Sequence, residues 1–293
     1  MKKIKWIIGI VLFLAVNIWL TSIMEVDIAE GIGEAPHKLE YLFGIKLPMN
    51  GINIATVLNT WLIMAVLIIF AIISTRKLVP VPGRAQTFAE MLVSGFDSLC
   101  CDVLGERRGR QYLPFIATLF VFVLLSNWIG VIPSFWHLFK GLVPSWLVLE
   151  EPTKDLNTPL CLGLLAFLVA HLSGIWVRGI KHYLIEYCQP MITIAGKNFP
   201  NLPMGVLNVV GEFGKTVSHS FRLFGNIFGG SIVVLVLSRL SIEFVRLMIG
   251  LPIGIPIGPL VFLNGFLGLF VGMVQAFVFA MLALVYISLW VNE

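Results

Sequence analysis

Residues 202–239 form an apolar stretch that is too long to cross a membrane upright. The one helix-breaking residue in it, Pro203, occupies a first-turn position where a helix tolerates proline. As a single helix, these roughly 38 residues would measure about 57 Å, whereas the hydrocarbon core of a bilayer is about 30 Å thick. We therefore expect a helix tilted by about 60°, well outside the usual range of about 0–40°.

A polar stripe runs along this expected helix. Its members recur at intervals of three or four residues, and they are Glu212, Lys215, His219, Arg222 and Asn226. On an α-helix this spacing places them on one face. An arginine at membrane depth costs roughly 2.5–3.5 kcal/mol on insertion scales, so a partner must offset that cost. The glycines that follow the arginine would let another helix approach closely: Gly225, Gly229 and Gly230.

A second long helix is expected over residues 259–290, after a turn that contains Pro252, Pro256 and Pro259. At about 32 residues and roughly 48 Å, it too exceeds the bilayer core. A sparse line of polar and small residues again falls on one face: Asn264, Gly268, Gly272 and Gln275. Two slanted helices joined by a tight turn are suited to crossing a curved partner.

The composition indicates an integral membrane protein. Hydrophobic residues make up 58% of the chain and charged residues 12%, about half the charge of a typical soluble domain. Lys and Arg cluster at the ends of apolar segments, as expected of topology signals, so the net charge of +4 does not indicate nucleic-acid binding. The four cysteines lack the spacing of a metal site, and we interpret them as packing residues: Cys100, Cys101, Cys161 and Cys188.

The remaining segments complete an all-α membrane fold of about five or six spans. Residues 1–24 are a signal-like segment or a membrane anchor, and the lack of an A-x-A-like site favours a retained helix. We expect further spans at residues 54–73, 114–138 and 160–177, with loops at residues 25–52 and 140–158. Residues 83–110 predict an amphipathic helix on the cytoplasmic surface, closed by Arg107, Arg108 and Arg110. Residues 179–201 predict a broken helix or re-entrant stretch, and residues 25–293 a single membrane domain.

Two motifs in this chain resemble the a subunit of F-type ATP synthases. One is Phe221-Arg222-Leu223-Phe224-Gly225-Asn226, and the other is Val274-Gln275-Ala276-Phe277-Val278-Phe279. Pro82-Gly83-Arg84 and Leu125-Ser126-Asn127-Trp128 resemble the surface helix and the following span of that family. The resemblance covers roughly residues 50–292.

The resemblance implies a fold and a mechanism. Residues 202–291 would form a tilted hairpin that packs on a ring of c subunits through 202–240 and 259–291, with b subunits and the F1 sector as further partners. Ions would enter one half-channel, neutralise a c-subunit carboxylate, travel with the ring and leave by a second half-channel. Arg222 matches the essential arginine, and Gln275 and Asn226 match residues near it. Glu212 matches a glutamate of some relatives, and with Lys215 and His219 it would line the cytoplasmic path. The resemblance also implies a cellular location for the chain, which is the energy-coupling membrane, most simply a bacterial plasma membrane.

One departure from the family affects the coupling ion. Many proton-using relatives carry a Glu/His pair in the outer half-channel, where this chain has Ser231 and Gly268. Neither residue titrates, whereas a proton relay benefits from groups with an accessible pKa and Na⁺ needs oxygen ligands. Both H⁺ and Na⁺ therefore remain open as the coupling ion. Ser231 and Asn264 complete the set of residues expected to take part in ion translocation.

Several alternatives remain open at the level of the sequence. Glu212 and Lys215 either line a path or simply pair with each other, and His219 is either a relay or an interior histidine. Gln275 is either functional or a packing residue. A stand-alone transporter or channel that binds an anion at Arg222 is the alternative function, although no second copy of the Arg222 segment is present. Val209 stands where a phosphate loop needs glycine, so we expect no nucleotide site. The chain has no H-E-x-x-H, G-x-S-x-G or haem-type Cys motif, and we expect no catalytic site, no metal and no cofactor in it.

Overall fold

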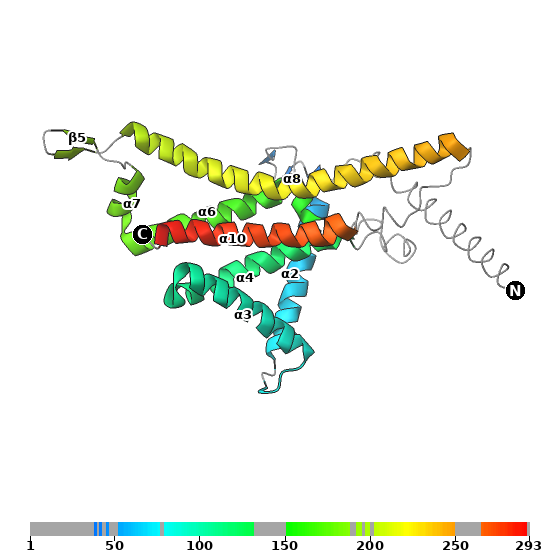
Figure 1. The fold of residues 1–293 in the computed structure, drawn as a ribbon, viewed down its shortest axis with the longest axis horizontal. Helices are drawn as coiled ribbons and strands as arrows, with labels where there is room; N and C mark the ends of the chain where they lie inside the picture. The colour runs from blue at the N-terminus through cyan, green and yellow to red at the C-terminus, as the bar shows by residue number, and fades with distance from the viewer. Residues whose placement is uncertain are drawn as a thin grey trace. The chain divides into compact units, whose positions relative to one another are not determined.

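The computed structural model is almost entirely helical in the part of the chain that it describes (Figure 1). The described residues are 38–39, 41–42, 45–46, 52–76, 79–131, 151–187, 192–194, 197–199, 202–249 and 265–291. The expected N-terminal helix at residues 1–24, the Gly/Pro turn before residue 259 and the site residue Asn264 lie outside these ranges, as do parts of both expected loops.

The helices follow one another along the chain with short connections. They are α2 (Ile54–Thr75), α3 (Arg84–Leu104), α4 (Glu106–Trp128), η1 (Ile129–Val131), η3 (Pro152–Lys154), α6 (Asn157–Arg178), α7 (Ile180–Tyr187), α8 (Leu202–Ile249), the π-helical η4 (Phe266–Val271) and α10 (Gly272–Val291). Three antiparallel strand pairs of two or three residues were not predicted from the sequence. They are β1 (Lys38–Leu39) with β4 (Ile52–Asn53), β2 (Tyr41–Leu42) with β3 (Ile45–Lys46), and β5 (Ile192–Ile194) with β6 (Lys197–Phe199).

The predicted all-α membrane fold is confirmed. Four helices in the described residues are long and apolar enough to cross a membrane: α2, α4, α6 and η4 with α10. Their large apolar side chains are widely exposed, with Trp61 and Ile68 on α2 and Trp176 on α6 as examples, which is the surface that lipid covers. The long helix predicted at residues 202–239 exists and continues further, because α8 has 48 residues.

The boundary between the surface helix and the next span differs from the prediction. The amphipathic helix was expected to run to residue 110, but α3 ends at Leu104 and α4 begins at Glu106. The break is at Gly105, whose φ of 78° is a conformation that glycine adopts without a Cβ penalty. The three arginines at 107, 108 and 110 therefore open α4 and do not close α3. Pro114 lies inside α4 and does not begin it.

The segment at residues 179–201 is only partly helical. Gly179, with φ of 80°, ends α6, and the eight-residue α7 follows at once. The strand pair β5–β6 takes up the remaining described residues, so the helix is broken as predicted and its second part is a short hairpin.

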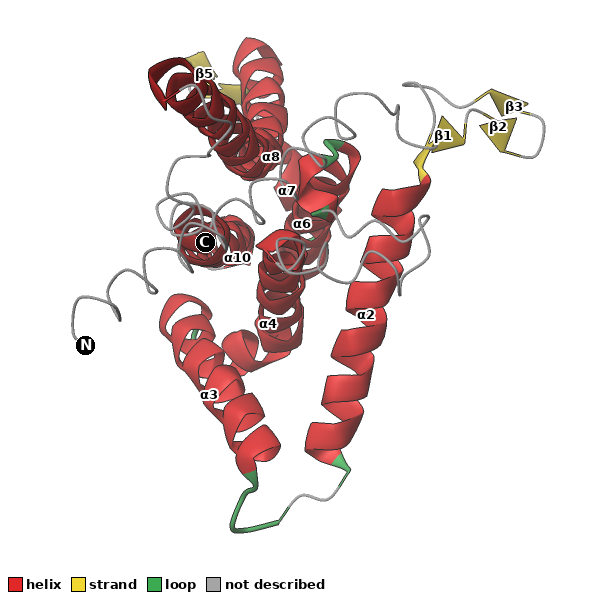
Figure 2. Ribbon diagram, turned by 90° about the vertical axis from the view of Figure 1, so that its right-hand side faces the viewer, coloured by secondary structure: helices red, strands yellow, loops and turns green. Residues whose placement is uncertain are grey.

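The contacts divide the chain into two compact units. The larger unit holds residues 62–126, 153–226 and 273–293. At its base α2 and α3 leave their connecting turn as the two arms of a V (Figure 2), with Phe70 and Phe88 in edge-to-face contact at 6.0 Å. In this turn the Gln86 side chain donates to the Val79 carbonyl at 3.1 Å and to the Glu90 carboxylate at 2.7 Å.

Helix α10 supplies much of the core of the larger unit. Its buried face consists of Ala276, Phe279, Ala280, Ala283, Leu284 and Ile287. Two arginines hold its C-terminal end, because Arg108 donates to the Val291 carbonyl at 2.5 Å and Arg178 donates to the Leu289 carbonyl at 3.1 Å. Cationic side chains at a helix C-terminus satisfy its last carbonyls and its dipole. Arg108 and Arg178 therefore join α4, α6 and α10 at this end.

The smaller unit contains residues 127–152 and 227–272 among others. Here side chains at the end of α4 bond to the backbone of η4 and of the first residue of α10. Asn127 donates from Nδ2 to the Gly272 carbonyl and Trp128 donates from Nε1 to the Leu269 carbonyl, both at 3.0 Å. A Cβ on Gly272 would lie 3.1 Å from the Asn127 Cβ, so glycine permits this close approach. A π-helical segment shifts the backbone pairing of a helix, and such segments are frequent at functional sites.

The α3–α4 junction yields a testable prediction. A Cβ on Gly109 would lie 2.7 Å from backbone atoms of Cys100 and Cys101, and backbone cannot move aside cheaply. We expect Gly109→Ala to destabilise this junction by about 1–3 kcal/mol through overpacking. The matched control is Gly95→Ala on α3, because a Cβ there meets nothing within 4 Å and alanine favours a helix.

The Cys100 thiol reports on this junction directly. Cys100 is fully buried, and burial, followed by the charges of Cys101 and Asp97, raises its pKa to about 11. Roughly one such thiol in a thousand is ionised at pH 8, against about a quarter for a free cysteine. In a chain whose other cysteines are serine, Gly109→Ala should therefore speed maleimide alkylation of Cys100 at pH 8 by about tenfold or more. Equal rates in the Gly109 and Gly95 variants would contradict the prediction.

Candidate functional site

The predicted polar stripe lies on α8, and the structure divides its members between two environments. His219 is buried, Glu212 is partly buried, and Lys215, Arg222 and Asn226 are exposed. The buried side of the stripe faces α6 and α10, as ring contacts of Phe167 with Phe213 at 5.5 Å and of His219 with Phe279 at 3.9 Å show. The one buried member, His219, therefore lies in the middle of the stripe, with exposed members on both sides of it.

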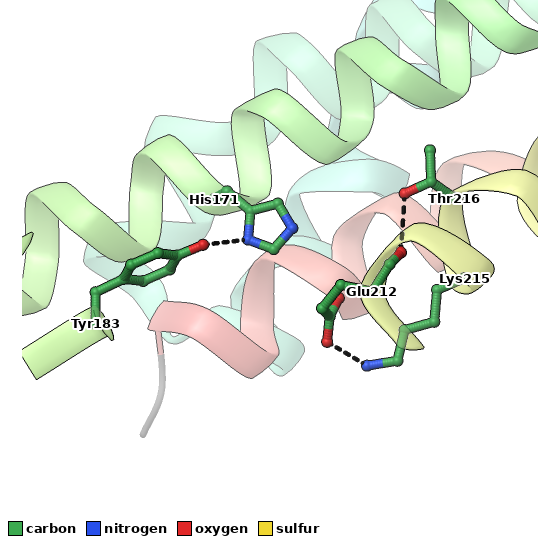
Figure 3. Close-up of polar contacts among 5 residues, drawn as sticks. All are labelled: His171, Tyr183, Glu212, Lys215 and Thr216. Atoms are coloured by element: carbon green, nitrogen blue, oxygen red, sulfur yellow. Dashed lines mark hydrogen bonds and ion pairs between the residues drawn. The ribbon is translucent and has the colours of Figure 1, made fainter. Parts of the chain in front are cut away.

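Glu212 and Lys215 pair with each other. Lys215 Nζ lies 2.6 Å from Glu212 Oε1, and Thr216 Oγ1 donates to the Glu212 carbonyl at 3.2 Å (Figure 3). The Lys215 side chain is 44% exposed, so the ion pair itself contributes little to stability. The pairing was one of the alternatives left open, and it leaves both groups on the wall of a cavity.

This cavity lies between α6, α8 and α10. Its lining combines the polar groups of the stripe with aromatic side chains: Gly163, Phe167, Ala170, His171, Glu212, Lys215, Thr216, His219, Tyr286 and Trp290. It offers about 10 Å³ of room for water centres, which is about what one water molecule needs. Small residues bring α6 and α8 together here, since a Cβ on Gly163 would overlap the Ser220 hydroxyl.

His219 is the most deeply placed polar residue of the stripe. Only 2% of its surface is exposed, and its ring stacks on Phe279 and meets the edge of Tyr286 at 5.6 Å. Among the described residues, neither ring nitrogen has a hydrogen-bond partner. One nitrogen of a neutral imidazole donates and the other accepts, so a buried ring in this state is able to bind a proton donor or acceptor from the cavity.

Sequence reasoning missed the His171–Tyr183 pair. Tyr183 Oη lies 2.7 Å from His171 Nδ1 inside the bundle (Figure 3), and both rings pack against Trp290 at 4.9–5.2 Å. His171 is an ionisable residue within the apolar span α6, and such residues are functional candidates by default. That signal was available in the sequence. Tyr183 was hidden in the segment whose structure the sequence left ambiguous.

Gln275 and Asn226 join the two long helices. Asn226 Nδ2 donates to Gln275 Oε1 at 2.6 Å, and Gln275 is only 5% exposed. Because His219 contacts Phe279 while Asn226 reaches Gln275, the two helices run antiparallel in this region. Gln275 is thereby joined to the asparagine one turn beyond Arg222.

Arg222 lies on the exposed side of α8. Its guanidinium makes no ion pair or hydrogen bond with any residue that the structure describes. Four further residues share this exposed face, and together with Arg222 they recur at intervals of three and four: Gly211, Gly214, Ser218 and Gly225. At each of these three glycines a Cβ would meet nothing within 4 Å, so packing inside the chain does not explain them.

The remaining positions of the predicted site are Ser231, Gly268 and Asn264. Ser231 Oγ donates to the Ile227 carbonyl of its own helix at 2.9 Å, which satisfies the hydroxyl locally. Gly268, the other position where a titratable group is missing, lies in η4. Asn264 lies outside the described residues.

Comparisons with known proteins agree on one family. The family described as "ATP synthase A chain" matches residues 57–288. "ATP synthase subunit a" of Geotalea daltonii is 32% identical over 78% of this chain and 84% of its own length. "ATP synthase subunit a 3" of Pelobacter propionicus is 32% identical over 85% of this chain and 94% of its own length. "ATP synthase subunit a" of Geobacter sulfurreducens is 33% identical, with coverages of 78% and 84%.

Proposed function

Because this chain belongs to the ATP synthase A chain family, we propose that it forms two ion half-channels and, with a c ring, couples ion flow to rotation. It is a multi-pass membrane subunit of the Fo sector, and the catalytic sites for ATP lie in F1. The proposed roles of the individual residues rest on the placement of Arg222.

The exposed guanidinium of Arg222, which pairs with none of the described residues, carries the proposal. A cation at membrane depth is costly and almost always has a partner or a functional role, yet the described part of this chain supplies no partner. The glycines on the same face leave room for a neighbouring helix to approach the α8 backbone. A helix that carries a carboxylate fits both features, and the c subunits of the ring are the partner that family membership suggests.

Arg222 would then control when the c carboxylate holds its ion. An opposite charge within about 4–6 Å favours the ionised form of a carboxylate. As a loaded site arrives, the guanidinium therefore promotes release of the ion to the exit path. The fixed positive charge also opposes direct passage of cations between the half-channels. Each elementary charge that crosses gains roughly 2.3 kcal/mol per 100 mV, and this supplies the torque.

The cavity between α6, α8 and α10 supports a role for Glu212, Lys215, Thr216 and His219 on the cytoplasmic side. It contains polar groups in an otherwise apolar bundle, and it has room for about one water. The Asn226–Gln275 hydrogen bond would fix α8 against α10 one turn from Arg222. We assign the four cavity residues to ion passage, and Asn226 and Gln275 to positioning of the arginine.

The proposed partners follow from this assignment. Residues 202–240 and 259–291 would pack on the c ring, b subunits of a peripheral stalk would hold the chain as a stator, and the F1 sector would connect indirectly. The bacterial relatives support a plasma-membrane location.

One experiment tests the function and identifies the ion. The complex is purified through a tag on this chain and reconstituted into liposomes, and ATP-driven uptake of H⁺ and of ²²Na⁺ is measured separately. We expect a ring of small hairpin proteins to co-purify and one of the two ions to accumulate. Na⁺ that stimulates ATP hydrolysis and protects the c carboxylate from carbodiimide would identify the sodium form. Ion transport by this chain alone, without ring or ATPase, would contradict the proposal and favour a stand-alone transporter.

A further inference from the structure

Glu151 is a partly buried carboxylate that the proposed mechanism does not yet use. It stands directly before η3 and belongs to the same compact unit as η1, Ser231 and η4. Its Oε2 atom is buried. Burying an ionised carboxylate costs free energy unless a partner or a bound ion compensates the charge.

The position of this carboxylate is set by Gly130 in η1. A methyl group on Gly130 would overlap the Glu151 Oε1, Cδ and Cγ atoms, so the carboxylate lies directly against the glycine backbone. Gly130 thus leaves the space that the carboxylate occupies. The neighbouring Trp128 donates a hydrogen bond to the backbone of η4, Asn127 donates one to Gly272 at the start of α10, and η1 contacts η4. The carboxylate therefore lies against the element that contacts the π-helical segment containing Gly268.

The membrane side of this carboxylate follows from the charges at the helix ends. Arginines open α4, and Arg178 with Lys181 follow the end of α6, so these ends are cytoplasmic. The other ends of both helices, and Glu151 between them in sequence, are on the outer side. The outer half-channel is also where Ser231 and Gly268 stand in place of the titratable pair.

We propose that Glu151 supplies the ion-binding carboxylate of the outer half-channel, in place of titratable groups at positions 231 and 268. This inference rests on the proposed function of the chain as the Fo stator channel. A carboxylate can accept and release a proton, and its oxygens can also coordinate Na⁺, so the role holds for either coupling ion. Gly130 is a positioning residue, because it leaves the carboxylate room against η1.

The test moves the carboxylate from residue 151 to residue 130, on the neighbouring element η1. Glu151→Gln keeps the size of the side chain but removes the ionisable group. The double variant Gly130→Asp with Glu151→Ala places a carboxylate at the same location from η1, and Gly130→Ala with Glu151→Ala is its matched control without a carboxylate. Asp155→Asn, whose carboxylate accepts from the Asn157 backbone N–H at 3.1 Å, controls for the loss of any acidic group after the loop.

All variants are measured as complete complexes in inverted membrane vesicles, and passive ion conduction after removal of F1 is expressed per assembled complex. We expect Glu151→Gln to lower conduction by about tenfold or more, as for the loss of a general acid–base group. Asp155→Asn should stay within about twofold of wild type. Gly130→Asp/Glu151→Ala should conduct several times faster than Gly130→Ala/Glu151→Ala.

Two results would overturn the proposal. One is wild-type conduction in Glu151→Gln, and the other is equal conduction in the two double variants. If Glu151→Gln does not assemble, the comparison between the double variants decides alone, because they differ only in the carboxylate at position 130. The proposed function is tested in the same vesicles by ATP-driven uptake in the wild type. Uptake without any effect of Glu151 removes only this inference, whereas no uptake in the wild type removes the function itself.

Discussion

Arg222→Ala is expected to abolish ATP-driven ion uptake while the complex still assembles. The guanidinium contacts no described residue through a hydrogen bond or ion pair, so its removal leaves the fold of this chain without a lost contact. In the assembled complex, however, it would leave a c-subunit carboxylate without its counter-charge. Breaking a buried ion pair by removing one partner costs about 3–5 kcal/mol, which corresponds to a rate lower by roughly a hundredfold to several thousandfold.

The measurement is ATP-driven uptake of the coupling ion by reconstituted complexes, with subunit amounts determined on the same sample. Arg110→Ala is the matched control, because Arg110 is an exposed cation outside the polar stripe that already has Asp97 as its partner at 3.9 Å. Its loss should reduce uptake much less than the loss of Arg222. Arg222→Lys should fall between the two, since a lysine keeps the charge but not the planar fork that binds a carboxylate bidentately. Near-normal uptake by Arg222→Ala would show that the assigned role is wrong.

The Arg222→Ala variant should also differ in passive conduction from a complex that has lost all ion transport. If the positive charge separates the half-channels, its removal permits cations to pass without rotation. We expect vesicles with Arg222→Ala to retain passive conduction once F1 is removed, although they show no coupled uptake. A variant that loses both activities to the same extent would point to a structural defect and not to a missing charge barrier.

The sequence predicted those features of the fold that depend on hydrophobic length and helical period. α2, α6 and the long α8 were expected close to their observed positions because an apolar run with polar residues on one face has few other solutions. The end of α3 was missed because a single glycine with positive φ interrupts a pattern that is amphipathic on both sides. Local periodicity does not reveal such a break, and three arginines were assigned to the wrong helix as a result.

The stripe shows where sequence reasoning reached its limit at the candidate site. Periodicity placed Glu212, His219 and Arg222 on one face, and α8 does so. It did not show that this face turns from the bundle interior at His219 to the exposed surface at Arg222, because that depends on which helices pack against α8. Contacts such as His171 with Tyr183 join segments that no local pattern connects. The position of Glu151 against Gly130 likewise required the three-dimensional structure.

Gly225→Leu is expected to block coupling while leaving the chain itself intact. A Cβ at Gly225 meets nothing within 4 Å, so the leucine would lie on the open face that also carries Arg222. Leucine has a higher helix propensity than glycine, which favours α8 by up to about 1 kcal/mol. A loss of function in this variant would therefore have to come from a neighbour outside the chain, and a c-subunit helix is the proposed neighbour.

The magnitude follows from the cost of overpacking. Extra methylene groups in a tightly packed contact cost about 1–3 kcal/mol, so coupled uptake should fall by roughly tenfold or more. The measurement is ATP-driven uptake per complex, together with the amount of ring that co-purifies through a tag on this chain. Gly95→Leu is the matched control, because Gly95 also has open space around it but lies on α3, away from the Arg222 face.

The pair of glycine variants separates two explanations for the small residues on α8. If these glycines serve only to let lipid or solvent approach, leucine at 225 should be as harmless as leucine at 95, since lipid adapts to an added side chain. If a helix of the ring lies against them, only the 225 variant should lose coupling, and the ring should co-purify poorly. Equal activity of the two variants would remove the packing argument for the partner of Arg222, although the arginine would still need an anion to offset its cost in the membrane.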